Sequence, residues 1–131
     1  MIDLGDWSRP AHVGFVSGGD IVASRHIASL MKQQGIAARC VGFCGSALAE
    51  ILLGSGHCIV TPQAQVMLHL AFVPDGTPEQ NRIAEVETIT WWFLLGLPSA
   101  DFSALLTKIA GSPTKSWLMR DDELRAAGCA T

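Results

Sequence analysis

Two kinds of apolar segment alternate along the chain, and this alternation limits the fold more than any other feature. Short continuous apolar runs have the length and composition of buried strands, whereas longer runs repeat their apolar residues at helical spacing. The predicted strands are 12–16, 38–43, 57–60 and 65–72. The predicted helices are 20–34, about 46–54, 78–92, from 99 or 101 to about 110, and about 122–127. Strands that alternate with helices predict an α/β fold with a largely parallel sheet.

Length and composition predict a single domain, residues 1–131, with more apolar surface than one small core needs. Apolar residues make up 49% of the 131 residues and charged residues only 16%. This excess predicts burial against partner subunits, and therefore a homo-oligomer. The net charge of −3 is spread without runs, so no basic patch is present that could bind phosphates or anionic lipid. We therefore expect neither nucleic acid nor a membrane as a partner.

The four cysteines form no CxxC pair and no zinc-like spacing, and they predict reduced, packed thiols and no metal site. Cys40 and Cys44 could form a disulfide only if the backbone brought them close, which a strand running into a turn does not favour. The opening residues MIDLGDWSRP contain neither a basic region nor an apolar one, so we expect no signal peptide. No apolar run reaches the roughly 18 residues of a membrane span.

Three features carry possible chemistry. Gly18 and Gly19 follow a predicted strand and open a helix, so their N–H groups could bind an oxyanion, although most glycine pairs are simply turns. Ser46 lies where a strand meets a helix N-terminus, and there it could be a nucleophile or only an N-cap. His69 lies within an apolar strand, where a hydrogen-bonded core histidine is the usual interpretation.

Taken together, these features favour the catalytic interpretation. The glycines, Ser46 and His69 each come at the C-terminal end of a predicted strand or just after it, which is where open α/β sheets bind their ligands. A hydroxyl needs a neighbouring base to attack a carbonyl near neutral pH, and an imidazole titrates in that range. The sequence thus predicts a nucleophile and a base.

Four segments in this order resemble the serine peptidase subunit of the Clp protease, in the ClpP/crotonase superfamily. They are VSGG (16–19), CGSALAEILLGSG (44–56), TPQAQVMLH (61–69) and ELRAAG (123–128). The resemblance runs from about residue 12 to the C-terminus. It implies a fold of repeated ββα units that is shortened at its N-terminus, and it makes 78–92 the counterpart of the helix that joins the family's rings.

The resemblance also implies roles for individual residues. Ser46 would be the nucleophile, which also caps its helix, and His69 the general base. The N–H groups of Gly19 (or Gly18) and Ala47 would form the oxyanion hole, without cofactor or metal. Implied partners are a peptide or protein substrate, further copies of the chain, and an unfoldase or a paralogous subunit.

The opening residues, without a signal peptide, set an expectation for the compartment. A cytoplasmic location is expected, or a periplasmic one if a missing N-terminal segment carried a signal. The form Cys-Gly-Ser-Ala at 44–47 also resembles a less characterised ClpP-like group, several of whose members are predicted to be periplasmic.

Two departures from the family weaken the predicted activity. Ser17 replaces the proline of the glycine segment, and the position of the family's triad aspartate falls at Lys115 or Ser116. His69 would then depend on a backbone carbonyl, a hydroxyl such as Thr114 or Ser116, or water to orient its ring. The prediction is a weakly active Ser–His hydrolase. Two alternatives stay open: a non-catalytic ClpP-like assembly subunit and a crotonase-type acyl-CoA enzyme.

Overall fold

The computed structural model describes residues 1–6, 21–95, 107, 109 and 116–131. They divide into two compact units. The first unit contains residues 1–68 and 118–131, and the second contains residues 69–117.

A four-stranded parallel sheet organises the first unit. Its strands, in spatial order, are β1 (Ile2–Leu4), β2 (Ala38–Cys40), β4 (Cys58–Val60) and β7 (Cys129–Ala130), and every neighbouring pair is parallel. A cross-strand ion pair supports β1, because the Arg39 guanidinium donates to both carboxylate oxygens of Asp3 at 2.9 and 3.0 Å. The strands β1 and β7 were not predicted from the sequence, because neither contains a continuous apolar run like the one that predicted β4.

A second sheet contains β3 (Phe43–Gly45), β5 (Gln65–His69) and β6 (Ser116–Leu118), in that order, with β3 parallel to β5. The predicted single strand 38–43 is therefore wrong. The chain bends at Val41 and Gly42 and passes from one sheet to the other: the Val41 N–H donates to the Leu4 carbonyl, and the Gly42 carbonyl accepts from Gln65 at 2.8 Å.

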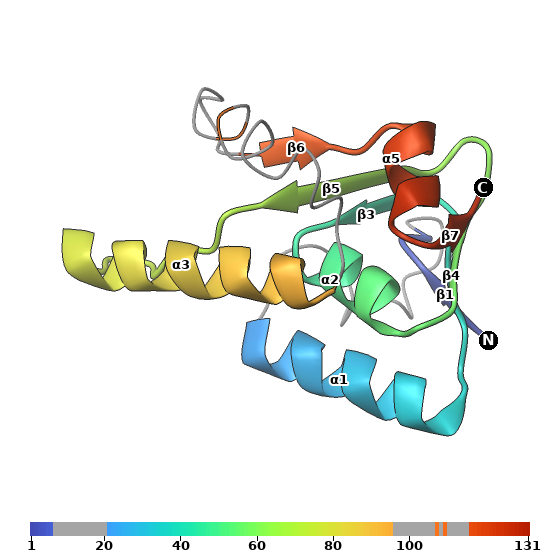
Figure 1. Cartoon of the computed structure of the whole chain (residues 1–131), viewed down its shortest axis with the longest axis horizontal. Helices are drawn as coiled ribbons and strands as arrows, with labels where there is room; N and C mark the ends of the chain where they lie inside the picture. The colour runs from blue at the N-terminus through green and yellow to red at the C-terminus, as the bar shows by residue number, and fades with distance from the viewer. Residues whose placement is uncertain (7–20, 96–106, 108, 110–115) are drawn as a thin grey trace. The chain divides into compact units, whose positions relative to one another are not determined.

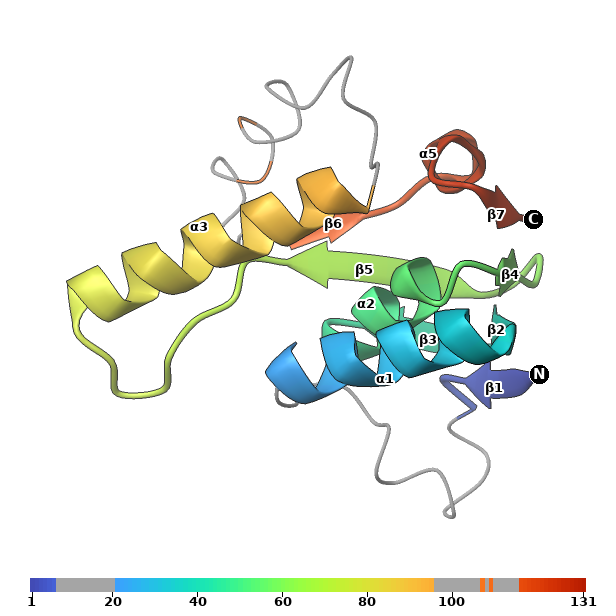
Figure 2. The same ribbon diagram turned by 60° about the horizontal axis from the view of Figure 1, so that its bottom comes forward.

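Helices α1 (Ile21–Gln34) and α2 (Ala47–Gly54) pack against each other in the first unit (Figures 1 and 2). A shorter helix, α5 (Asp121–Ala126), precedes β7. Six of the eight α2 residues are buried, which explains why its sequence ALAEILLG is apolar apart from Glu50. The unit's core also includes these buried side chains: Leu4, Met31, Cys40, Cys44, Val60, Val66, Leu68 and Leu124.

Helix α3 (Pro78–Leu94) is the long element of the second unit. It begins with a capping box, in which the Thr77 hydroxyl accepts from the Gln80 N–H and the Gln80 side chain accepts from the Thr77 N–H. Thr88 and Trp92 are buried on one side, whereas Ile83, Val86 and Phe93 are exposed. Val86 follows Ile83 by three positions and Phe93 follows Val86 by seven, so the three side chains lie along one face of the helix as an apolar stripe.

The mixed α/β class and the parallel sheet agree with the sequence prediction, and so do the helices α1, α2, α3 and α5. The predicted strand 12–16 lies outside the described residues, and so does most of the predicted helix that ends near 110. The repeated ββα arrangement and the single domain remain predictions. None of the helices in the described ranges combines the length and the apolar character that crossing a membrane requires.

Candidate active site at the turn after β3

Ser46 occupies a single-residue turn between β3 and α2, with φ 58° and ψ −121°. A positive φ brings the Cβ of an ordinary residue close to its own backbone, which costs of order 1–3 kcal/mol. Such conformations gather at functional sites. In the nucleophile elbow of hydrolases, a strained strand–turn–helix junction presents a serine hydroxyl in the same way. The local backbone thus has the form that an exposed nucleophile needs.

Hydrogen bonds and packing hold this turn on both sides. The Ser46 N–H donates to the Met67 carbonyl at 2.9 Å, and the Ser46 carbonyl accepts from the Glu50 N–H at 3.2 Å. Gly45 pairs with Met67 across the β3–β5 ladder. A Cβ added to Gly45 would lie 2.7 Å from the Phe43 ring, so only glycine fits before the serine unless that ring moves.

The Ser46 hydroxyl does not cap α2, although Ser46 occupies the N-cap position. The prediction that it caps the helix was therefore wrong. A capping serine has an extended backbone that aims its oxygen at the N–H groups of the first turn, and the left-handed φ of Ser46 changes that direction. Ser46 is half-buried, and its hydroxyl makes no capping hydrogen bond to the helix.

The oxyanion donors were predicted at Gly18, Gly19 and Ala47. Ala47 is the first residue of α2. An N–H in the first turn has no acceptor within its own helix, and it lies at the positive end of the helix dipole. Ala47 can thus offer a donor directly after Ser46. Gly18 and Gly19 lie outside the described residues.

His69 is the last residue of β5 and the first residue of the second unit. Its Nδ1 lies 2.8 Å from the Leu70 carbonyl oxygen. Because a carbonyl only accepts, Nδ1 carries the proton in the neutral ring, and the Nε2 lone pair faces away from this bond. A backbone carbonyl was one of the three supports expected for this ring. The pairing of Ser46 with His69 remains a prediction.

The residues considered for the third triad position give no carboxylate. Ser116 is the half-buried first residue of β6, and Thr114 and Lys115 lie outside the described residues. In the part of the chain that the structure describes, no three His, Cys, Asp or Glu side chains gather as a metal site would require.

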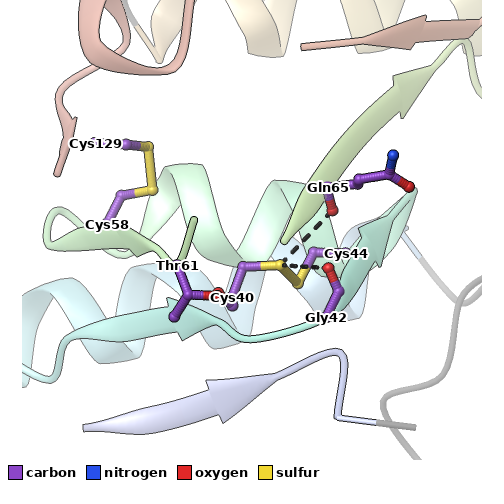
Figure 3. Close-up of a disulfide and its surroundings, with 7 residues drawn as sticks. All are labelled: Cys40, Gly42, Cys44, Cys58, Thr61, Gln65 and Cys129. Carbon is purple, nitrogen blue, oxygen red and sulfur yellow. Dashed lines mark hydrogen bonds between the residues drawn. A yellow bond between two sulfur atoms is a disulfide. The ribbon is translucent and has the colours of Figure 1, made fainter. Parts of the chain in front are cut away.

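The cysteines form two disulfides, Cys40–Cys44 and Cys58–Cys129 (Figure 3). The prediction of reduced thiols was wrong. It took 38–43 as one strand, whereas the bend between β2 and β3 brings the Cα atoms of Cys40 and Cys44 to 6.2 Å. Stable disulfides are typical of oxidising compartments.

A buried ion pair near the turn was also not predicted. Glu50, in the first turn of α2, is 3% exposed, and its carboxylate lies 3.5 Å from Nε of Arg25 in α1. Its one sequence signal is a carboxylate within an otherwise apolar helix. Charges at such depth are found in pairs, so this contact ties α1 to the helix that follows Ser46.

No protein-family model matches the chain, and no curated protein matches it either. A solved structure of a ClpP1 mutant from Listeria monocytogenes is similar to it, with 19% identity and a TM-score of 0.48. The match covers 85% of this chain and 64% of the other chain, so this chain spans less than two thirds of that protein's length. A likeness at this level says nothing about individual residues, and the catalytic roles of Ser46 and His69 remain predictions.

Proposed function

We propose that the protein is a serine hydrolase of the peptidase type, with Ser46 as its nucleophile, in a single ClpP-like domain. The observation that carries the proposal is the backbone of Ser46. Ser46 is a half-buried, non-glycine residue with φ 58° between a strand and a helix, and its hydroxyl does not cap that helix. Strain of this kind would be removed by a glycine, so its presence at a serine favours a role for the hydroxyl.

The proposed chemistry uses the residues that the sequence assigns to the site. The Ser46 oxygen attacks the carbonyl carbon of a peptide or ester while Nε2 of His69 takes the hydroxyl proton. The negative oxygen that forms accepts hydrogen bonds from the Ala47 N–H and from a glycine N–H at 18 or 19. The His69 imidazolium then protonates the leaving amine or alcohol. A water molecule then attacks the acyl carbon while His69 takes its proton, and the imidazolium returns that proton to the Ser46 oxygen as the acid leaves.

We expect this reaction to be slow. Nδ1 of His69 donates to the Leu70 carbonyl, which fixes the tautomer but carries no full charge to stabilise the imidazolium. In a Ser-His-Asp protease, removing the charge of the aspartate lowers turnover by about four orders of magnitude. Activated esters are therefore the expected assay substrates.

A fluorophosphonate probe tests the proposal, because it reacts with activated serines and leaves ordinary hydroxyls unmodified. The expected result is one modified residue, mapped by mass spectrometry to Ser46. Ser46→Ala should lose the label, and His69→Ala should lose nearly all of it, since neither member of a dyad works alone. An unlabelled wild-type protein that is folded, or a label that survives Ser46→Ala, would overturn the assignment.

The exposed stripe on α3 favours a second candidate, a ClpP-like assembly subunit with or without catalysis. Ile83, Val86 and Phe93 are 49%, 57% and 58% exposed, and large apolar side chains in a row on one helix favour burial against a partner. A second copy of the chain is the simplest partner, and a paralogous subunit or an unfoldase are the others. Assembly without any fluorophosphonate labelling would favour this candidate over the hydrolase.

A further inference from the structure

We propose that the Cys40–Cys44 disulfide positions the turn that presents Ser46, so that the site is competent only while this bond is oxidised. This inference rests on the proposed hydrolase function. The bond lies two residues before Ser46, because Cys44 is the middle residue of β3. We therefore treat Cys40 and Cys44 as positioning residues and not as catalytic residues.

The disulfide spans the point at which the chain changes sheets. Cys40 is the last residue of β2 in the four-stranded sheet, and Cys44 belongs to β3 in the other sheet. The bend at Val41 and Gly42 lies between them, and Figure 3 shows the bond closing this bend. The bond thus fixes where β3 begins relative to β2.

Dense packing surrounds the two sulfurs. Both cysteines are fully buried. The Cys40 sulfur lies 3.8 Å from the Gly42 carbonyl oxygen and 3.7 Å from that of Gln65 (Figure 3). A disulfide sulfur has no hydrogen to donate, so in the oxidised protein these are close contacts. On the far side, a Cβ added to Gly5 would lie 2.8 Å from the Cys44 sulfur.

Reduction would need space that this packing does not provide. Two bonded sulfurs are about 2 Å apart, whereas two thiols separate to a van der Waals distance of roughly 3.5–4 Å. Because Gly5 and the two carbonyls lie against these sulfurs, we expect the separation to displace β3. The position of β3 determines two features of Ser46: the hydrogen bond from its N–H to the Met67 carbonyl, and its positive φ. A strained conformation persists only where its surroundings hold it.

The redox step needs a dithiol as its co-reactant. One thiolate of the dithiol attacks a sulfur of the bond and forms a mixed disulfide, and the second thiolate then displaces the protein thiol. The products are two cysteine thiols and one cyclic disulfide, after transfer of two electrons and two protons. Because both sulfurs are buried, attack requires the turn to open.

The second disulfide is a matched control within the same unit. Cys58 pairs with Ala38 at the start of β2, whereas Cys40 is the last residue of that strand. Cys58–Cys129 therefore joins β4 to β7 at the opposite end of the sheet from the bend. Removing it also removes two sulfurs from buried positions, without touching the segment 40–46.

The experiment compares three proteins: wild type, Cys40→Ala/Cys44→Ala and Cys58→Ala/Cys129→Ala. The rate of fluorophosphonate labelling at saturating probe is measured on protein that is folded by circular dichroism. A misplacement of about 1 Å at a reacting group costs up to roughly a hundredfold in rate, so we expect a fall of at least about tenfold in the first variant. The control should stay within about twofold of wild type. Equal labelling in all three proteins, or equal losses in both variants, would overturn the inference.

Two further measurements keep the test decisive if the first variant misfolds or the wild type does not label. In wild type treated with dithiothreitol, labelling should fall with the fraction of alkylatable Cys40 and Cys44 and return on reoxidation. Hydrogen exchange at the Ser46 amide should be faster than in wild type in Cys40→Ala/Cys44→Ala, but not in Cys58→Ala/Cys129→Ala. Faster exchange in an unlabelled protein would retain the positioning role and reject the hydrolase, whereas unchanged exchange would reject the positioning role itself.

Discussion

Removing the Cys58–Cys129 disulfide should cost more stability than removing Cys40–Cys44, although Cys40–Cys44 is the disulfide beside Ser46. The perturbation is a pair of double variants, Cys58→Ala/Cys129→Ala and Cys40→Ala/Cys44→Ala. All four cysteines are at least nine-tenths buried, so each variant loses two buried sulfurs and leaves similar cavities. The difference between the variants therefore reports mainly the length of chain that each bond closes.

The magnitude follows from the sequence separations, which are 71 residues for Cys58–Cys129 and 4 for Cys40–Cys44. A disulfide stabilises mainly by restricting the unfolded chain, and its contribution grows with the logarithm of the loop it closes. For these loops the entropy model gives about 4.4 and about 1.9 kcal/mol at 25 °C. The Cys58–Cys129 disulfide should thus contribute about 2.5 kcal/mol more to the free energy of unfolding than Cys40–Cys44.

Urea unfolding followed by circular dichroism measures both values by linear extrapolation. The Cys58→Ala/Cys129→Ala variant should also show a larger m-value, because its unfolded chain exposes more surface once the long loop is open. A cost for Cys40→Ala/Cys44→Ala that equals or exceeds the other would refute the reasoning. In that case local packing around the bend, and not loop entropy, would set the contribution of the bonds.

Three further outcomes are expected. Ser46→Gly should raise the free energy of unfolding in urea by about 1 kcal/mol and abolish fluorophosphonate labelling, since glycine adopts the positive φ without strain; a loss of stability would mean that the turn is not strained. Val86→Glu should shift light scattering at tens of micromolar toward monomer, with Glu87→Gln as the exposed control on the same helix; a wild type that is already monomeric contradicts the assembly proposal. Hydrogen bonds from Arg120 lower the pKa of Asp122, so Arg120→Ala should raise that pKa in an NMR titration. Because the pKa is lowered in the folded protein, the contact stabilises the fold above the ordinary aspartate pKa, and this stabilisation is lost as pH falls through the lowered pKa. An unchanged pKa in Arg120→Ala would show that the contact does not persist in solution.

The sequence by itself determined the elements whose signal is local. The helices α1, α2 and α3 follow from apolar spacing and end signals, such as Gly35 after α1 and Pro78 at the start of α3. The strand–helix alternation was enough to predict parallel pairing, since a crossover helix brings the next strand back in the same direction. The same alternation predicted that Ser46 lies between a strand and a helix, as it does between β3 and α2. These features depend on residues within about one or two turns of one another.

Tertiary structure decided whatever depends on residues far apart in the chain. Strands β1 and β7 pair with β2 and β4, and neither contains a continuous apolar run that marks it as a strand by itself. The bend after Cys40 arises because Val41 bonds to β1 while Gly42 bonds to Gln65, and this switch of sheets is what makes the Cys40–Cys44 bond possible. The left-handed backbone of Ser46 likewise depends on its bond to Met67, 21 positions further along the chain. A local pattern shows which segments become helices or strands. Only the packed chain fixes which distant groups meet and whether the Ser46 hydroxyl caps its helix.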